Sequence, residues 1–372
     1  MKKIRTLAAA YAAPLATVVA AFAGTAYLPA ALAQINPSVL PATGPLLKQT
    51  MTRLLLTDSA RSGNRVIAVG DRGYIVLSDS NGESWERAET PPNTPLLNAV
   101  FFSDPKAGWA VGHDAVILKS GDEGKKWTKV FSAPDDQKPL MDVLFIDANR
   151  GFAVGAYGSF YETADAGKTW KARKLLETPK APPATAKKGK AAAVEIDDGK
   201  GGDKGGDKGG DKGGDEDRHF NAIVKLGDNR LIIAGEAGML LKSDDAGKTW
   251  AKITSPYKGS FFGAVQAQDG SVLIYGLRGK IFRSTDAALR DWKIVENKSV
   301  ASVMGSTRLP DGALVLSGLA GTVLISRDNG ASFTPLPTGL TKGYAAPLLG
   351  APSALLLVGE AGARDMVLPP AK

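Results

Sequence analysis

Short apolar runs separated by polar turns recur along the chain, and the pattern is clearest between residues 235 and 250. This stretch reads G-E-A-G-M-L-L-K-S-D-D-A-G-K-T-W. An apolar run that ends in Gly235 precedes a G-x-x-G turn, a second apolar run follows, and a polar turn leads to Trp250. Apolar runs of this length between turn signals indicate β-strands. Asp245 and Gly247 suit the polar turn, because Asp can hydrogen-bond the backbone two residues on and Gly tolerates a positive φ. The pattern predicts strand, turn, strand, turn, strand.

The first glycine of this unit recurs at a nearly constant interval. Aligned copies begin at Gly70, Gly112, Gly155, Gly235, Gly276, Gly318 and Gly359. The spacings are 42, 43, 80, 41, 42 and 41 residues, and the long one contains a low-complexity insertion of about 40 residues. A period in the low forties with four short strands is typical of a β-propeller blade, which must stack on its neighbours around a closed ring to bury both faces. The prediction is an all-β fold, a seven-bladed β-propeller over residues 51–372.

The polar turn of the unit has a recurring sequence. It reads S-G-D-E-G-K-K-W over residues 120–127 and T-A-D-A-G-K-T-W over residues 163–170. This resembles the Asp-box, or bacterial neuraminidase repeat, S-x-D-x-G-x-T-W. Some copies depart from it: Ser80 stands where Asp is expected, Ala288 replaces Gly, and the sixth copy ends in Phe333. Tryptophans that follow the boxes hold a regular position in the repeat, which favours packing between blades over ligand stacking.

Residues 1–33 have the pattern of a secretory signal peptide. Lys2, Lys3 and Arg5 precede a long uncharged stretch, and A-L-A at residues 31–33 matches a cleavage site. The uncharged stretch is also long enough to span a bilayer, so a retained anchor is the alternative. We expect cleavage, export to the periplasm, and a mature protein that does not span the membrane. The chain has no Cys, so neither a lipoprotein anchor nor disulfides are expected.

Residues 34–50 form a lead-in rich in proline. The seventh repeat reaches the end of the chain with one strand fewer than the others. Propellers commonly close with a strand from the opposite terminus, since an unpaired edge would be exposed. Residues near Pro37 to Leu40 are therefore candidates for a closing strand in the last blade, and a disordered tail is the other reading.

Residues 177–217 separate the third repeat from the fourth. They contain a G-G-D-K repeat and almost no large apolar residues, which predicts a flexible loop that cannot offset the entropy of ordering. The formal charge of the chain is +8, and removal of the three positive signal residues leaves 8 − 3 = +5. Because Lys and Arg are spread over all repeats without a basic run interleaved with aromatics, nucleic-acid binding is not expected.

The G-x-x-G turns are the candidate binding surface. Successive strands of a blade are antiparallel, so these turns and the blade-to-blade connections lie on one face and the Asp-boxes lie on the other. The turns would surround the mouth of the central channel, and the insertion would leave the ring on the same face. The candidate partner-binding residues are Asp71, Arg72, His113, Asp114, Tyr157, Glu236, Arg278 and Glu360, and the same turns carry Leu277 and Leu319.

A secreted sialidase is the enzyme alternative, because it resembles this chain in repeat and architecture. Its chemistry needs three converging arginines, a Tyr nucleophile activated by Glu, and an Asp acid/base. The nearest match to its Arg-Ile-Pro motif is F-R-S-T at residues 282–285, which lacks the proline and falls in a third strand. Arg72 and Arg278 have no third arginine in an equivalent turn. Asp71 and Glu360 are neighbours across the ring closure, so an acid/base pair stays open beside the reading that both are solvated turn residues.

The chain offers no constellation that points to a metal or a cofactor. His113 and His219, its two histidines, lack metal-ligand partners at a useful spacing. We therefore expect no catalytic residue, metal or cofactor. A propeller that binds a glycan or another small ligand is the remaining alternative.

The pattern V-G-x-x-G-x-x-x-x-S/T-x-D-x-G-x-x-W runs from about Met51 to Leu368 apart from the insertion. It resembles the photosystem II stability/assembly factor-like family. The resemblance implies a non-catalytic propeller in the lumen or periplasm that binds a membrane-protein client during assembly. In non-photosynthetic bacteria it implies service to another envelope complex, such as a resistance-nodulation-division type exporter. Photosynthetic members use an arginine patch, for which only Arg72 and Arg278 offer a counterpart, so the resemblance does not specify a photosystem client.

Overall fold

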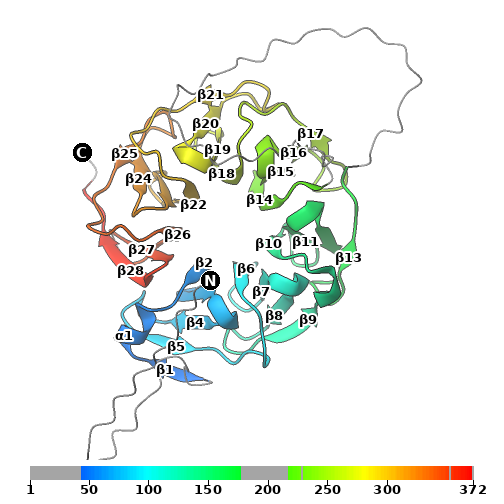
Figure 1. Ribbon diagram of the computed structural model, residues 1–372, viewed down its shortest axis with the longest axis vertical. Coiled ribbons are helices and arrows are strands. Elements are labelled where there is room, and N and C mark those ends of the chain that lie inside the picture. Colours follow the sequence, from blue (N-terminus) through cyan, green and yellow to red (C-terminus); the bar gives the residue numbers. More distant parts are fainter. Residues whose placement is uncertain (1–42, 177–216, 228, 352, 371–372) are drawn as a thin grey trace, which may run out of the picture. The chain divides into compact units, whose positions relative to one another are not determined.

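The computed structural model describes residues 43–176, 217–227, 229–351 and 353–370, all within one compact unit, Leu40–Lys372. These residues form seven antiparallel sheets that follow one another around a ring (Figure 1). The predicted seven-bladed β-propeller is confirmed. The predicted signal peptide at 1–33, the proposed closing strand near Pro37 to Leu40, and the insertion up to residue 216 lie outside the described residues.

Each blade is a meander in which consecutive strands pair. The first three blades comprise β2 (Leu56–Ser62), β3 (Arg65–Gly70), β4 (Ile75–Ser78) and β5 (Trp85–Arg87); β6 (Leu97–Phe102), β7 (Gly108–Gly112), β8 (Ile117–Ser120) and β9 (Thr128–Phe131); and β10 (Leu140–Phe145), β11 (Gly151–Gly155), β12 (Phe160–Thr163) and β13 (Lys171–Ala172). The next three comprise β14 (Phe220–Leu226), β15 (Arg230–Gly235), β16 (Leu240–Ser243) and β17 (Ala251–Lys252); β18 (Phe261–Gln266), β19 (Val272–Gly276), β20 (Ile281–Ser284) and β21 (Lys293–Ile294); and β22 (Val303–Arg308), β23 (Leu314–Gly318), β24 (Val323–Ser326) and β25 (Thr334–Pro335). The seventh has β26 (Tyr344–Leu349), β27 (Ala354–Gly359) and β28 (Gly362–Val367).

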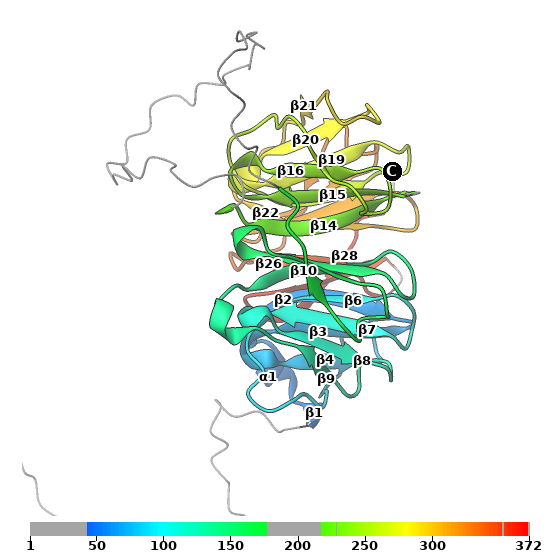
Figure 2. The same cartoon turned by 90° about the vertical axis from the view of Figure 1, so that its right-hand side faces the viewer.

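Short helices occupy the connections. The one α-helix of the described residues, α1 (Lys48–Met51), precedes the first blade. Five 3-10 helices join a second strand to a third strand: η1 (Asp71–Gly73), η2 (His113–Ala115), η4 (Ala156–Gly158), η6 (Glu236–Gly238) and η7 (Leu277–Gly279). A further one, η3 (Pro134–Asp136), lies between the second and third blades. Figure 2 shows the ring edge-on, with the strands running from one face to the other.

The core lies between the blades. Seven apolar clusters are present in the described residues, and each combines side chains of two neighbouring blades. Trp127, for example, lies with Ile67 and Ile75 of the preceding blade. Trp85 lies with Leu356 of the seventh blade. The indole groups therefore stabilise the contacts between blades, as the regular Trp positions predicted.

The Asp-box turns are held by one recurring set of hydrogen bonds. In the fourth blade the Ser243 hydroxyl donates to Asp245 Oδ1 at 2.9 Å, and that oxygen accepts the backbone N–H of Thr249 at 2.8 Å. Trp250 Nε1 donates to the carbonyl of Gly247 at 3.1 Å. A Cβ built on Gly247 would lie 2.4 Å from Phe152 in the preceding blade. Glycine is therefore required because the turn packs directly on its neighbour.

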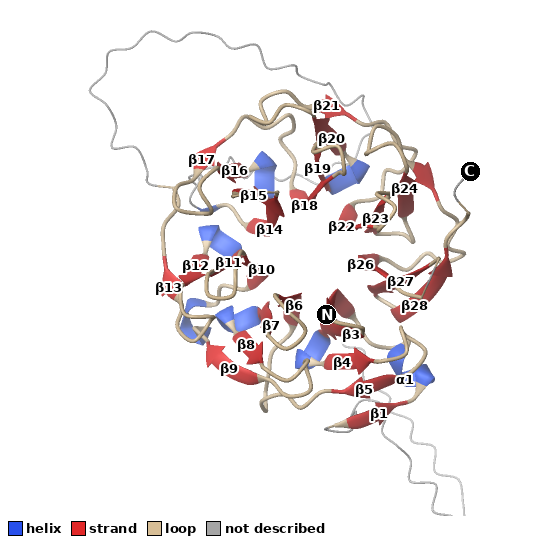
Figure 3. Ribbon diagram, turned by 180° about the vertical axis from the view of Figure 1, so that it is seen from behind, coloured by secondary structure: helices blue, strands red, loops and turns tan. Residues whose placement is uncertain are grey.

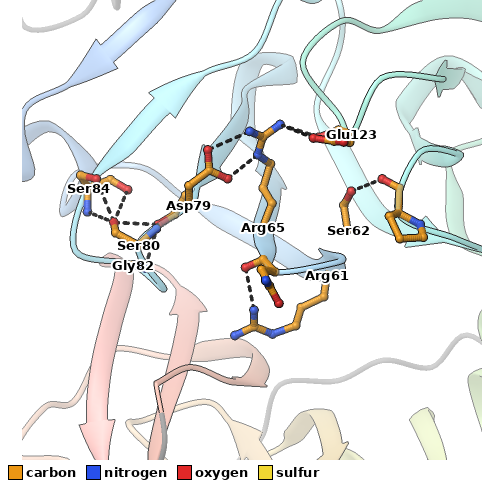
Figure 4. A network of polar contacts seen from close by, with 11 residues as sticks. Arg61, Ser62, Arg65, Asp79, Ser80, Gly82, Ser84 and Glu123 are labelled. Carbon is orange, nitrogen blue, oxygen red and sulfur yellow. Dashed lines mark hydrogen bonds and ion pairs between the residues drawn. The ribbon is translucent and has the colours of Figure 1, made fainter.

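Basic side chains join several Asp-boxes to the blade before them. Arg65 Nη1 donates to the carbonyl of Glu123 at 3.2 Å, while its other nitrogens hold both oxygens of Asp79 (Figure 4). Lys119 reaches the carbonyl of Ala166 at 2.7 Å, and Arg283 reaches that of Asn329 at 2.9 Å. Each acceptor carbonyl belongs to the residue that directly precedes the box glycine, and each of these residues has a positive φ. The turn geometry therefore presents the carbonyl to the neighbouring blade.

The inner strands are linked directly. A register shift near the start of each first strand marks a β-bulge. The side chain of the bulged residue reaches the next blade in three places: Thr57 Oγ1 donates to the Leu97 carbonyl at 2.6 Å, Asn98 Nδ2 to that of Leu140 at 2.7 Å, and Asn221 Nδ2 to that of Phe261 at 2.8 Å. The bulges thus serve to join blades as well as to bend strands.

Among the described residues, the first and last blades are joined by core packing and a backbone hydrogen bond. Met51 and Leu54 lie in one cluster with Val358 of the seventh blade, and the Gly362 N–H donates to the Leu54 carbonyl at 2.9 Å. The closing strand expected near Pro37 to Leu40 lies outside the described residues and stays a prediction, whereas the described end of the lead-in belongs to the first blade. The strand β1 (Gly44–Leu46) pairs antiparallel with β5, and so becomes a fifth strand of the first blade. Among the described residues the seventh blade has three strands.

Candidate partner-binding face

The first glycine of every repeat is fixed by one close backbone approach. The Gly112 position is typical: a Cβ built there would lie 2.1 Å from the carbonyl oxygen of Leu96. The same carbonyl accepts the backbone N–H of His113 at 2.9 Å. The equivalent glycines all meet the carbonyl of the residue just before their own first strand at 2.0 to 2.3 Å, namely Gly70, Gly155, Gly235, Gly276, Gly318 and Gly359. Glycine therefore recurs at the end of each second strand because a side chain there would collide with the backbone at the start of the first strand.

The second residue of six turns has a left-handed backbone conformation. Arg72 has φ 53°, Asp114 57°, Tyr157 53° and Arg278 56°, and Ala237 and Ala320 occupy the same position with φ 48° and 53°. Non-glycine residues rarely adopt this region. Arg72, Asp114, Tyr157 and Arg278 are exposed in this conformation. The turns that form 3-10 helices, which exclude that of Ala320, are among the short blue helices around the ring in Figure 3. The fold therefore presents variable side chains on a uniform backbone.

The last glycine of the turn contacts the connection between blades. A Cβ on Gly238 would lie 2.2 Å from the carbonyl of Tyr257, and one on Gly279 would lie 2.3 Å from that of Ser299. Both carbonyls belong to segments that lead to the next blade. The predicted arrangement, with turns and blade connections on one face, is therefore present. We call this surface the turn face.

Four of the predicted residues, Asp71, Arg72, Tyr157 and Glu236, lie in contacts on the turn face. Arg72 Nε lies 3.4 Å from Asp71 Oδ2, so these two pair within one turn. Tyr157 and His219 meet edge to face, with ring centroids 4.9 Å apart. Glu236 Oε2 accepts the backbone N–H of His219 at 3.3 Å and lies 3.8 Å from its Nδ1. His219 therefore connects Tyr157 of the third blade to Glu236 of the fourth.

The remaining predicted residues are exposed on separate blades. His113 and Asp114 share a turn of the second blade, Arg278 lies in the fifth, and Glu360 lies in the two-residue turn between β27 and β28. Their positions on the turn face agree with the sequence prediction. Whether any of them contacts a partner stays a prediction.

Sequence reasoning missed two groups on this face. It assigned no role to His219 or Arg218, although Arg218 donates to the Ala237 carbonyl at 3.0 Å and fixes the strand that enters the fourth blade. It also missed Val300 and Leu340, which are 87% and 39% exposed. They accompany Leu319, which is 44% exposed. The signal for the apolar group lay in Leu319 itself, an apolar residue at the tip of a turn.

A pocket of about 390 Å³ lies beside these apolar residues. It is enclosed by residues 298–299, 320–324 and 335–341, which belong to the sixth blade and the two connections that flank it. Thr338 Oγ1 donates to the Gly321 carbonyl at 3.0 Å and holds the second connection against the turn. The pocket can accept a small apolar group.

The segment nearest to the sialidase motif lies in a strand, and its arginine is already paired. Arg283 lies in β20, as predicted for the F-R-S-T segment, and binds Asp269 Oδ2 at 2.7 Å. In the part of the chain that the structure describes, no three His, Cys, Asp or Glu side chains gather as a metal site requires. No helix within those residues has the length and apolar character of a membrane span.

The fold and the repeat define a class: the chain is a seven-bladed β-propeller built from Asp-box repeats. Residues 123–182 match the family model of the photosynthesis system II assembly factor YCF48. This match confirms the resemblance to the photosystem II assembly factor-like family. A comparison with curated proteins gives no match.

Solved structures share the propeller fold at low sequence identity. YCF48 bound to a D1 peptide is 16% identical, with a TM-score of 0.62 over 89% of this chain and 98% of that one. YCF48 from Cyanidioschyzon merolae is also 16% identical, with a TM-score of 0.62 over 88% and 99%. Virginiamycin B lyase from Staphylococcus aureus is 11% identical, with a TM-score of 0.63 over 86% and 97%. Because an enzyme shares the fold, architecture alone does not decide whether the chain is catalytic.

Proposed function

We propose that this protein is a non-catalytic scaffold that binds a membrane or envelope protein client through its turn face during assembly of a larger complex. The observation that carries the proposal is the distribution of exposed apolar side chains. Of the eight large apolar residues that are exposed among the described residues, five lie at turns or connections of the turn face: Leu55, Tyr157, Val300, Leu319 and Leu340. Clustered exposed apolar groups on one face are typical of a protein-binding surface.

The fifth to seventh blades are the part of the turn face best suited to contact a client. Leu319 and Leu340 lie beside the pocket of about 390 Å³. Lys298 lines the same pocket, and Lys342 follows it in the chain. A client segment with an apolar anchor flanked by carboxylates would fit this surface, because the anchor would lose contact with water and the carboxylates would face the lysines.

The comparisons supply the remaining support. The repeat resembles that of an assembly factor, and a structure with the same fold has a D1 peptide bound. By analogy, the client of this chain is a membrane protein. We propose export to the periplasm from the signal pattern of residues 1–33. In a non-photosynthetic host, an exporter of the resistance-nodulation-division type is the proposed client.

The test is capture of the client from membranes of the native host with the tagged full-length chain. Wild-type protein should enrich one membrane protein complex, and that complex should assemble poorly when the gene is deleted. Leu319→Glu/Leu340→Glu should reduce the captured amount at least about tenfold, because a buried unpaired carboxylate is costly. Val367→Glu is the matched control, since Val367 is 80% exposed at the far end of β28. Equal capture by the two variants would contradict the proposed face.

Catalysis is the alternative, and it makes a different demand. A sialidase-like hydrolase would need Asp71 or Glu360 as an acid or base, but Asp71 already pairs with Arg72. Turnover of a fluorogenic sialoside that disappeared in Asp71→Ala or Glu360→Ala would replace the scaffold proposal. We expect no turnover above the rate without protein.

A further inference from the structure

A second pocket lies on the opposite side of the ring, where the Asp-boxes of the third and fourth blades meet. It has a volume of about 560 Å³. Four cationic side chains line it, Arg150, Lys171, Arg173 and Lys248, together with the carboxylates of Glu162 and Asp165. The formal charge of the lining is therefore 4 − 2 = +2.

The two carboxylates are already engaged within the protein. Glu162 Oε2 accepts from Arg173 Nη1 at 3.1 Å. Asp165 Oδ2 accepts the hydroxyl of Thr169 at 2.6 Å, and its Oδ1 accepts the Thr169 backbone N–H at 2.9 Å. These bonds hold the pKa of Asp165 well below its ordinary value. Both carboxylates thus already have hydrogen-bond partners within the protein.

Arg173 forms a fixed wall of the pocket. Its Nη1 also donates to the Gly247 carbonyl at 3.0 Å, and its Nη2 donates to the Lys248 carbonyl. The equivalent position in the other blades with a fourth strand is apolar, at Ala88, Val130, Ile253, Val295 and Leu336. The backbone N–H of Arg173 makes the same bond to its third strand that Val295 and Leu336 make. Between the third and fourth blades, a guanidinium group thus takes the place of an apolar side chain, and this contact between blades is polar.

The uncompensated charge belongs to Lys171 and Lys248. Both side chains are exposed. Within the residues that the structure describes, neither ammonium group has an ion pair or a hydrogen bond. Arg150 also lines the pocket, but its Nε binds Asp147 at 2.6 Å, so its charge is already paired. Two ammonium groups that line one pocket, one from the third blade and one from the fourth, suit an anion with more than one charged group.

We propose that this pocket binds a compact polyanion that carries two or more carboxylate or phosphate groups. Its volume lies within the range of small-ligand sites, about 300–1,000 Å³. Phe152 is the single aromatic residue of the lining and is 5% exposed, so the pocket presents no aromatic face on which a sugar or a base would stack. The ligand is therefore hydrophilic and is recognised by charge. This site lies apart from the turn face and does not depend on the client.

Titration calorimetry with citrate and with inorganic pyrophosphate tests the proposal. Saturable binding of either probe at one site per chain is expected, and the two probes distinguish a carboxylate ligand from a phosphate ligand. Acetate at the same ionic strength should bind too weakly to detect. Affinity should fall as salt is added, because the attraction is screened. Absence of saturable binding by both polyanions would overturn the proposal.

Substitution locates the site. Lys171→Ala/Lys248→Ala should weaken binding at least about tenfold, the usual scale for two lost charged contacts. Lys168→Ala is the matched control, because Lys168 occupies in the Asp-box of the third blade the position that Lys248 occupies in the fourth, and it does not line the pocket. It should bind within about twofold of the wild type. Both variants alter exposed side chains, and thermal denaturation should show that both fold. Equal affinities of the double variant and the wild type would place the ligand elsewhere and refute the assignment.

Discussion

Asp142 Oδ2 accepts a hydrogen bond of 2.9 Å from the backbone N–H of Ile223, so that a carboxyl group on β10 holds the inner strand of the next blade. Asp58 makes the equivalent bond of 2.9 Å to the N–H of Val100. Burial raises the pKa of each carboxyl group to about 7, although the backbone donors oppose the shift, and the charge of Asp58 raises the pKa of Asp142 further. The contact between the first and second blades and the contact between the third and fourth blades are therefore held by carboxyl groups that titrate near neutral pH.

The first prediction is that stability falls as pH rises from about 4 to about 7. In this window the native state keeps protons on Asp58 and Asp142, whereas the unfolded chain, with an ordinary pKa of 3.8, releases them. Proton loss therefore favours unfolding. Since one pKa unit corresponds to about 1.4 kcal/mol, the two groups together should account for a loss on the order of 5 kcal/mol between pH 5 and pH 8. Urea denaturation at pH 5 and pH 8 measures it, and Asp58→Asn/Asp142→Asn should remove most of the difference.

A carboxylate with the opposite shift provides the control for this prediction. Bonds from Thr249 lower the pKa of Asp245 to about 2. Its contribution is therefore complete above the unfolded value of 3.8 and is lost only as pH falls toward 2. Asp245→Asn should destabilise the protein equally at pH 5 and pH 8. A wild-type protein with equal stability at both pH values would show that the inner carboxyl groups do not titrate as described.

A second prediction concerns the repeat glycines. Gly112→Ala should destabilise the protein by about 3 kcal/mol or more, because its Cβ would lie 2.1 Å from the Leu96 carbonyl and neither backbone segment can move freely. Gly121 has nothing within 4 Å of its Cβ position, so Gly121→Ala should change stability by less than about 0.5 kcal/mol. Chemical denaturation compares the two. Similar losses in both variants would argue against the close approach as the reason for the glycine.

A third prediction concerns the basic links between blades. Arg283→Met should cost about 1–3 kcal/mol, since Arg283 is 18% exposed and binds both the Asn329 carbonyl and Asp269. Arg290 lies 3.8 Å from Asp286 and is 79% exposed. Arg290→Met should therefore change stability by less than about 0.5 kcal/mol. Denaturation midpoints distinguish the two sites. If Arg290→Met lost as much stability as Arg283→Met, both losses would come from the removal of a positive charge and not from the specific contacts of Arg283.

The sequence predicted the blades and the location of the turns because each depends on a local requirement. Glycine recurs where a Cβ would strike the first strand, and Asp recurs where a turn needs an acceptor. The pairing of β1 with the first blade was not predictable, because G-P-L carries no strand signal and its partner is 40 residues away in the chain. His219 was missed because its contacts arise between two blades. One signal for the second pocket was present in the sequence, namely a charged Arg173 at a position that is apolar elsewhere.

The first Asp-box lacks its aspartate, and restoring it is the last prediction. Ser80 Oγ accepts the backbone N–H of Ser84 at 2.8 Å and lies 2.8 Å from the Ser84 hydroxyl (Figure 4). In the sixth blade Asp328 makes the fuller set: its Oδ1 accepts the Ser326 hydroxyl at 2.7 Å, and its Oδ2 accepts the Ser332 hydroxyl at 2.6 Å. Ser78 and Ser84 stand where Ser326 and Ser332 stand, so an Asp at position 80 would find both donors.

Ser80→Asp should therefore stabilise the protein by about 0.5–1.5 kcal/mol at pH 7, the usual net value of an added hydrogen bond. The reciprocal change, Asp328→Ser, should destabilise it by a similar amount, because the shorter side chain reaches one donor group fewer. Thermal and urea denaturation of both variants give the comparison. Asp79 and Glu83 flank the first box, and their repulsion of a new carboxylate should weaken at high salt. A gain that appeared only at high salt would identify this repulsion as the reason that the first box keeps serine, whereas no gain at any salt concentration would contradict the hydrogen-bond argument.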